Sequence, residues 1–135
     1  MAPKTAATAS TTVLVVDDEA PIRQIARRIL EDGGYQITEA EGGLEAIALL
    51  AQGHPLDLLM ADLDMPGLGG DEMVRRIRAT RPDLKVLYVT GHIDKLMDAR
   101  PLWEGEAFLE KPFNPVGLRE AIALLLYGTV KERGR

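Results

Sequence analysis

Five polar side chains stand out because their types could together hold a divalent cation and a phosphoryl group. They are three carboxylates, one hydroxyl and one amine: Asp17, Asp18, Asp62, Thr90 and Lys111. Carboxylates that converge in one crevice repel each other, so either their pKa values rise or a hard cation neutralises them. Mg²⁺ suits such a set because it takes a few carboxylates and leaves positions for water and phosphate oxygens. A lysine could then supply a point charge to one phosphoryl oxygen, and a threonine hydroxyl could hydrogen-bond another.

The elements that must position these side chains are indicated by hydrophobic patterning. Short apolar runs rich in β-branched residues alternate with segments of helical period, which is typical of a parallel sheet with helices on both faces. The runs predict five strands, at residues 13–16, 36–40, 57–61, 85–89 and 107–110. Each of the five polar residues comes just after one of these strands. Because the carboxyl ends of parallel strands rim the ligand crevice of an open sheet, we expect the five side chains in one site.

Helical periodicity predicts which residues of the helices face the sheet. Pro21 suits the first turn of a helix that Gly33 closes. Its stripe comprises Ile22, Ile25, Ala26, Ile29 and Leu30. The next two helices are expected to bury Leu44, Ile47, Ala48 and Ala51, then Met73, Val74 and Ile77. A helix over residues 94–100 should be short or irregular because Pro101 follows it.

The last helix, from Pro115 to about Val130, carries more apolar residues than one buried face needs. A core stripe is formed by Leu118, Ile122 and Leu125. Val116, Ala123, Leu126 and Val130 form part of a second apolar face. We expect this face, with the short fourth helix, to contact a downstream protein or a second copy of the chain. The alternative is that it covers an irregular loop around Trp103.

Composition narrows the class of protein. The 135 residues include no cysteine and two histidines, so disulfides, cysteine-based zinc sites and histidine-rich metal sites are excluded. The net charge of −5 disfavours direct DNA binding, and the apolar runs are too short to cross a bilayer. We expect a soluble cytoplasmic protein with a disordered tail at 1–11, one domain at 12–131 and a tail at 132–135. Met1 and the lack of an output domain favour a standalone protein.

Four motifs, in order and on matching strand ends, resemble the response-regulator receiver family over about residues 12 to 130. They are VVDDE at 15–19, DLDMPGLGG at 62–70, YVTG at 88–91 and FLEKPF at 108–113. The resemblance implies a doubly wound, five-stranded parallel sheet in the flavodoxin-like order 2-1-3-4-5. It also implies a signalling switch of the two-component phosphorelay, which catalyses its own aspartyl phosphorylation and slow dephosphorylation and is not a metabolic enzyme.

The resemblance further assigns roles to individual residues. Asp62 would be the phosphoacceptor, taking a phosphoryl group from a sensor histidine kinase or a histidine phosphotransfer protein. Asp18 and Asp62 would bind Mg²⁺ directly, Asp17 mainly through water, and Asp64 through its backbone carbonyl. Two residues would hold the phosphoryl oxygens, namely Thr90 and Lys111. The resemblance also places a switch aromatic at Phe108 and a cis peptide bond before Pro112.

Other interpretations of the same residues are available. Adjacent aspartates often start a helix, as Asp17 and Asp18 could, and Asp62 and Asp64 could be turn residues before a proline. The sequence Asp62-Leu63-Asp64 is similar to the DxD motif of haloacid-dehalogenase-type phosphatases, but the Thr or Val and the downstream acidic pair of that family are missing. A third possibility is an adaptor that keeps the fold without being phosphorylated, although no catalytic residue is missing.

Overall fold

A computed structural model describes residues 11–91 and 105–128 and contains one five-stranded sheet. The strands are β1 (Thr12–Val16), β2 (Gln36–Ala40), β3 (Leu58–Asp62), β4 (Lys85–Thr90) and β5 (Glu106–Glu110). All neighbouring pairs are parallel, and the order is β2-β1-β3-β4-β5. The predicted fold class and strand order are therefore confirmed.

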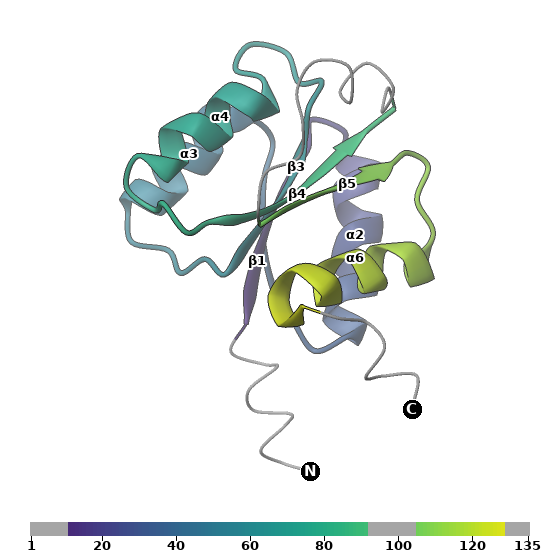
Figure 1. Cartoon of the computed structure of the whole chain (residues 1–135). Coiled ribbons are helices and arrows are strands. Elements are labelled where there is room, and N and C mark those ends of the chain that lie inside the picture. Colours follow the sequence, from purple (N-terminus) through teal and green to yellow (C-terminus); the bar gives the residue numbers. More distant parts are fainter. Residues whose placement is uncertain (1–10, 92–104, 129–135) are drawn as a thin grey trace.

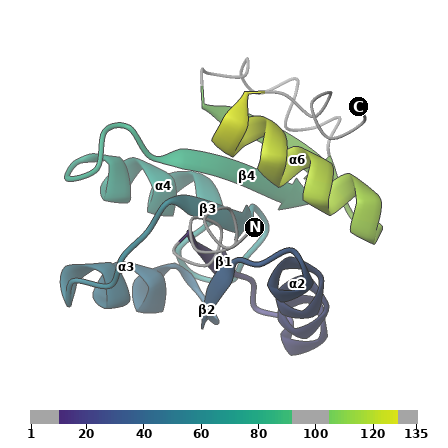
Figure 2. The same ribbon diagram turned by 90° about the horizontal axis from the view of Figure 1, so that it is seen from below.

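Helices cover both faces of this sheet. They are α2 (Ala20–Asp32), α3 (Gly43–Ala51), α4 (Gly70–Arg78) and α6 (Pro115–Tyr127). Helices α2 and α6 lie on one face and α3 and α4 on the other (Figures 1 and 2). Alternating side chains of β1 enter two separate cores, since Val13 and Val15 pack toward α2 and α6 whereas Leu14 and Val16 pack toward α3 and α4.

The register of the strands brings their carboxyl ends to one edge of the sheet. Val16 pairs with Ala61 across β1 and β3, and Asp62 pairs with Val89 across β3 and β4. Strand β3 begins one residue later than predicted and includes Asp62 as its last residue. Its position in the middle of the sheet agrees with the continuous apolar run that predicted a strand buried on both faces.

The buried face of α3 differs from the predicted one. Leu44, Ala48 and Ala51 are exposed, while Gly43 and Ala46 are buried. Every residue of α3 other than Glu45 is apolar or glycine, so its periodicity does not select a face. Tertiary packing selects it instead, because small residues let the helix approach closely; a Cβ built on Gly43 would meet the side chain of Leu68 at 2.9 Å.

The stripes of α2 and α6 are only partly as predicted. Ala26, Ile29 and Leu30 are buried in α2, but Ile25 is 50% exposed. In α6, the predicted second face is smaller because Ala123 is buried and Leu126 packs against the core. The large hydrophobic residues exposed on α6 are Val116, Leu124 and Tyr127.

Helix α6 also ends earlier than the predicted limit near Val130. Gly128 adopts a left-handed conformation with φ of 83°, and its N–H donates to the carbonyl of Leu124. This glycine cap stops the helix at Tyr127. Several predictions fall outside the described residues: the helix at 94–100, Trp103, Val130, residues 1–10 of the first tail and the whole of the tail at 132–135. Within the described ranges, no helix combines the length and apolar character needed to cross a bilayer.

Candidate functional site

Asp62 forms the floor of the site at the end of the central strand β3. It is 3% exposed, and the next residue continues the sheet through a 3.1 Å bond from the N–H of Leu63 to the carbonyl of Val89. The chain then turns, so that the N–H of Asp64 donates back to Oδ1 of Asp62 at 3.1 Å. These bonds fix the buried carboxylate and leave its Oδ2 facing the other residues of the site.

Asp17 and Asp18 lie in the turn between β1 and α2. The N–H of Asp17 donates to the carbonyl of Ala40, and Oδ1 of Asp17 accepts from the N–H of Glu19 at 2.9 Å. Asp17 is buried, whereas Asp18 is exposed. Asp17 is therefore shielded from solvent, whereas Asp18 is accessible to it.

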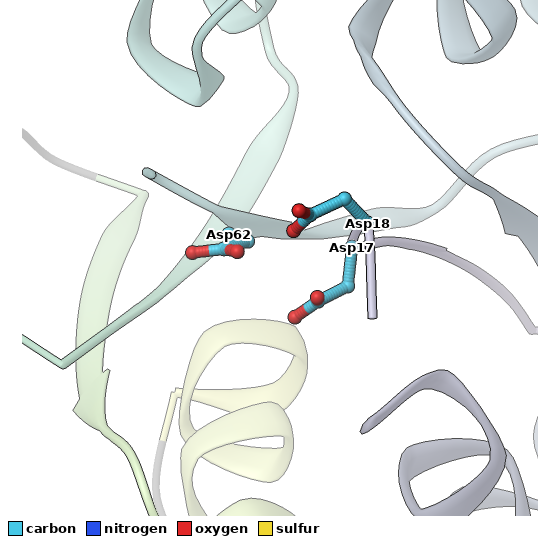
Figure 3. Close-up of side chains that lie close together, drawn as sticks. All are labelled: Asp17, Asp18 and Asp62. Carbon is cyan, nitrogen blue, oxygen red and sulfur yellow. The ribbon is translucent and has the colours of Figure 1, made fainter. Parts of the chain in front are cut away.

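The three carboxylates gather as the sequence predicts. Asp17, Asp18 and Asp62 each offer an oxygen, and these oxygens all lie within 4.8 Å of one another. Figure 3 shows the two residues of the β1–α2 turn projecting beside Asp62. An octahedral Mg²⁺ with bonds of about 2.1 Å separates opposite ligands by roughly 4 Å. The chemistry and spacing of this oxygen set therefore fit the ion.

Lys111 supplies the positive charge of the site. Its Nζ lies 3.1 Å from Oδ2 of Asp17, 3.3 Å from Oδ2 of Asp62 and 3.8 Å from Oε2 of the exposed Glu19. The N–H of Lys111 donates to the carbonyl of Thr90, which ties the end of β5 to the end of β4. The bond between Lys111 and Pro112 is cis, as the resemblance implied.

The pKa values of Asp62 and Lys111 reflect burial and the charges close to them. Burial is the main cause that raises the pKa of Asp62, and the charge of Asp17 adds to it; the bond from the N–H of Asp64 and the charge of Lys111 oppose the rise. For Lys111, burial acts to lower the pKa, but the bonds and charges of Asp17 and Asp62 outweigh it and raise the pKa. The lysine is therefore held in its charged form beside the carboxylates.

Thr90 lies at the end of β4 and is 1% exposed. Its Oγ1 donates to Oδ2 of Asp64 at 3.2 Å. The carboxylate of Asp64 therefore faces Thr90, outside the cluster of three carboxylates. The predicted switch aromatic, Phe108, is partly buried, and its ring lies 5.7 Å from that of the fully buried Tyr88 at 55°.

Sequence reasoning missed Arg23, which bonds to the backbone of the acidic turn, and Glu39, which bonds to Arg23. Arg23 on α2 donates to the backbone carbonyl of Asp17 at 2.7 Å, and its Nε donates to Glu39 on β2 at 3.1 Å. A signal was present for Glu39 alone, since it is a charged residue in the last part of a predicted strand. The rule that places functional groups at the carboxyl ends of strands applies to β2 as well.

Comparisons with known proteins agree with this geometry. A family model described as the response regulator receiver domain matches residues 13–123. The chain is 36% identical over 107 residues to the sensor kinase CckA of Brucella abortus, covering 78% of this chain and 11% of that protein. The chain spans between 11% and 54% of the length of the curated relatives it matches.

Solved structures are similar over most of their length. A response regulator receiver protein from Sinorhizobium medicae has a TM-score of 0.78 and 28% identity, covering 86% of this chain and 94% of that one. The response regulator TrrA from Thermotoga maritima, solved in complex with Mg²⁺ and BeF, has a TM-score of 0.72 and 34% identity, covering 86% of this chain and 99% of that one.

Proposed function

The chain belongs to the response regulator receiver domain family, and from this premise we propose that Asp62 accepts a phosphoryl group in a Mg²⁺-dependent reaction. The donor would be the phosphohistidine of a sensor histidine kinase or a histidine phosphotransfer protein. The observation that carries the proposal is the position of Lys111, whose Nζ lies 3.3 Å from Oδ2 of the buried Asp62 and 3.1 Å from Oδ2 of Asp17. One cation thus lies beside the nucleophile and beside the neighbouring carboxylate.

The chain's own groups divide the chemistry among them. An oxygen of Asp62 attacks the phosphorus in line, so that the new O–P bond forms as the P–N bond to the donor imidazole breaks. Lys111 is placed to offset the negative charge of the phosphoryl oxygens, and Thr90 can donate its hydroxyl to one of them. Mg²⁺, when bound, supplies further positive charge against the same oxygens. We assign it the carboxylates of Asp18 and Asp62, Asp17 through water, and the backbone carbonyl of Asp64.

The product acts as a switch. Once a phosphoryl group occupies Asp62, Thr90 can exchange its bond to Asp64 for one to a phosphoryl oxygen. Phe108 lies on the neighbouring strand β5, two positions before its end. We propose that this exchange changes a partner-binding surface that includes the exposed apolar residues of α6. The downstream partner is a protein or a second copy of the chain in the cytoplasm, with no membrane and no direct DNA binding involved.

Incubation with a small phosphodonor and Mg²⁺, followed by intact-mass measurement, tests the proposal. The wild-type chain should gain one phosphoryl group, and chelation of Mg²⁺ should abolish the gain. Asp62→Asn keeps the side-chain shape but removes the nucleophilic oxygen, so it should gain no mass. Asp57→Asn is the matched control, because Asp57 is exposed and directly precedes the opposite end of the same strand.

Thr90→Ala and Lys111→Ala should slow transfer without abolishing it, since both residues stabilise the group without bonding to it covalently. Phosphorylation of the Asp62→Asn variant at the wild-type rate would overturn the assignment. A wild-type chain that gains no mass with the donor and Mg²⁺ would overturn the proposed function itself.

A further inference from the structure

Arg23 on α2 bonds to the backbone of the acidic turn, which holds Asp17 and Asp18. Its NH1 donates to the backbone carbonyl of Asp17 at 2.7 Å, and its Nε donates to Oε1 of Glu39 at 3.1 Å. The side chain is 12% exposed, so these bonds are largely protected from water. A single planar guanidinium thus joins α2, the β1–α2 turn and β2, which its fixed fork of donors makes possible.

The contact completes a frame around Asp17. The N–H of this residue donates to the carbonyl of Ala40, and its Oδ1 accepts from the N–H of Glu19. Arg23 adds the third restraint by binding the carbonyl, and Glu39 is the residue next to Ala40 on β2. The backbone of the acidic turn is therefore fixed on both sides of the Asp17 Cα, leaving the carboxylates to face the site.

We propose that Arg23 is a positioning residue for the metal site: it holds the turn so that the carboxylates of Asp17 and Asp18 converge with Asp62. The inference rests on the proposed Mg²⁺ binding. Partners that orient metal ligands commonly change metal affinity by about 10-fold or more when removed. We expect the lower end here, because Arg23 acts through the backbone and does not bond to a ligand oxygen.

The direction in which Mg²⁺ affinity changes distinguishes a positioning role of Arg23 from a direct effect of its charge. Arg23 carries a positive charge near a cluster of carboxylates, so deleting that charge should by itself strengthen the binding of a cation. A positioning role predicts the opposite, because the freed turn must be ordered again when the ion binds. Weaker Mg²⁺ binding in Arg23→Ala therefore cannot be an effect of charge.

Arg27 provides a matched control one helical turn away on α2. It bonds to Glu39 through its Nε, to Glu31 through NH1 and to the carbonyl of Ile37 through NH2, and none of these bonds involves the acidic turn. Arg27→Ala therefore removes the same charge and a bond to the same carboxylate. Arg23→Lys keeps a donor that can reach the carbonyl of Asp17 and serves as the conservative variant.

The experiment is calorimetric titration of the unphosphorylated chains with MgCl₂, with thermal unfolding in chelator as the measure of stability. Arg23→Ala should raise the Mg²⁺ Kd by about 10-fold, Arg23→Lys should recover much of the loss, and Arg27→Ala should stay within about twofold of wild type. A Kd for Arg23→Ala equal to or below that of wild type overturns the inference while leaving the proposed function intact. An Arg27→Ala variant that loses as much affinity overturns it too, because the effect is then general to α2. Failure of the wild-type chain to bind Mg²⁺ would overturn both the positioning role of Arg23 and the proposed Mg²⁺-dependent function.

Discussion

At the scale of single residues, the carboxylate of Asp62 combines burial with a negative charge. Burial raises its pKa, which makes the ionised form more costly, yet a nucleophile must be ionised. The surroundings reduce this conflict, since Oδ1 accepts a bond from the N–H of Asp64 and Oδ2 faces Lys111. The bond to Oδ1 restrains one oxygen, so Oδ2 is the oxygen that faces the charged groups of the site.

Asp18 is the exposed member of the carboxylate cluster, so it can be altered with little effect on the core. Asp18→Asn removes one negative charge from the proposed ligand set while keeping the side-chain shape. We expect Mg²⁺ affinity to fall by about 10-fold, because Mg²⁺ depends on few carboxylates for its charge neutralisation. Calorimetric titration measures the Kd. Asp32→Asn, which removes the same charge from an exposed position at the end of α2, should leave it unchanged, and an unaltered Kd in Asp18→Asn would remove this residue from the ligand set.

The bond from Thr90 to Asp64 must be exchanged when the hydroxyl turns to a phosphoryl oxygen. Asp64→Ala removes the acceptor, so we expect it to accelerate phosphorylation by a small phosphodonor. The loss of the Asp64 charge should also accelerate the reaction, because that charge repels the incoming phosphoryl group. In a Thr90→Val background, only this effect of charge should remain. The difference between backgrounds should correspond to a coupling free energy of about 1 kcal/mol; equal acceleration in both backgrounds would show that the bond imposes no cost.

At the scale of elements, the start of α4 lies against the end of β3 at the site. A Cβ built on Gly70 would meet the backbone carbonyl oxygen of Asp62 at 2.4 Å, whereas one built on Gly69 would lie 3.6 Å from the carbonyl oxygen of Leu63. The first is an overlap with backbone that cannot move aside, and the second is ordinary contact. Gly70 therefore lets the helix begin directly beside the phosphoacceptor.

Gly70→Ala should lower the free energy of unfolding by about 1–3 kcal/mol, the usual cost of forcing extra atoms into a packed position. Gly69→Ala should change it by less than about 0.5 kcal/mol. Chemical denaturation of the two variants measures both values. Since the clash pushes on Asp62, phosphorylation of Gly70→Ala under native conditions should also be slower. Equal stability of the two alanine variants would contradict the close approach of α4 to β3.

The sequence predicted elements and site edges better than it predicted helix faces. The strand ends could be found because apolar runs stop where polar residues begin, which places Asp62 and Thr90 at one edge. The face of α3 could not be found, because Leu44 and Ala46 are both apolar and the choice between them depends on how closely the helix approaches Leu68. The bond from Arg23 to a backbone carbonyl also leaves no pattern in the sequence, since it requires the folded turn.

At the scale of the whole molecule, the buried central strands of the sheet end at an edge that holds the charged residues of the site. The central strands β1, β3 and β4 are almost wholly buried and pair in register along most of their length. Their carboxyl ends hold carboxylates that repel one another, and a hydrophobic residue of similar size would avoid this repulsion. Functional residues of this kind commonly reduce stability, and the remainder of the fold must compensate for them.

The ionised carboxylate of Asp62 should lower the stability of the metal-free chain. The pKa of Asp62 is raised in the folded chain, so ionisation destabilises the fold; the penalty is complete above the raised pKa, including at neutral pH, and disappears as the pH falls through it. Asp62→Asn should therefore raise the thermal midpoint of the metal-free chain at neutral pH, where a gain of 1 kcal/mol corresponds to roughly 4 °C. Lys111 does not become an unpaired buried cation in the variant, because it retains Asp17 at 3.1 Å.

Mg²⁺ should reverse the order of the two thermal midpoints by stabilising wild type more than Asp62→Asn, since a ligand stabilises the state that binds it. Asp57→Asn weakens the bond that Oδ2 of Asp57 accepts from the N–H of Thr12, so it should not raise the metal-free midpoint, and Mg²⁺ should stabilise it as much as wild type. A lower metal-free midpoint for Asp62→Asn would mean that the ionised carboxylate stabilises the fold and that the site carries no such cost.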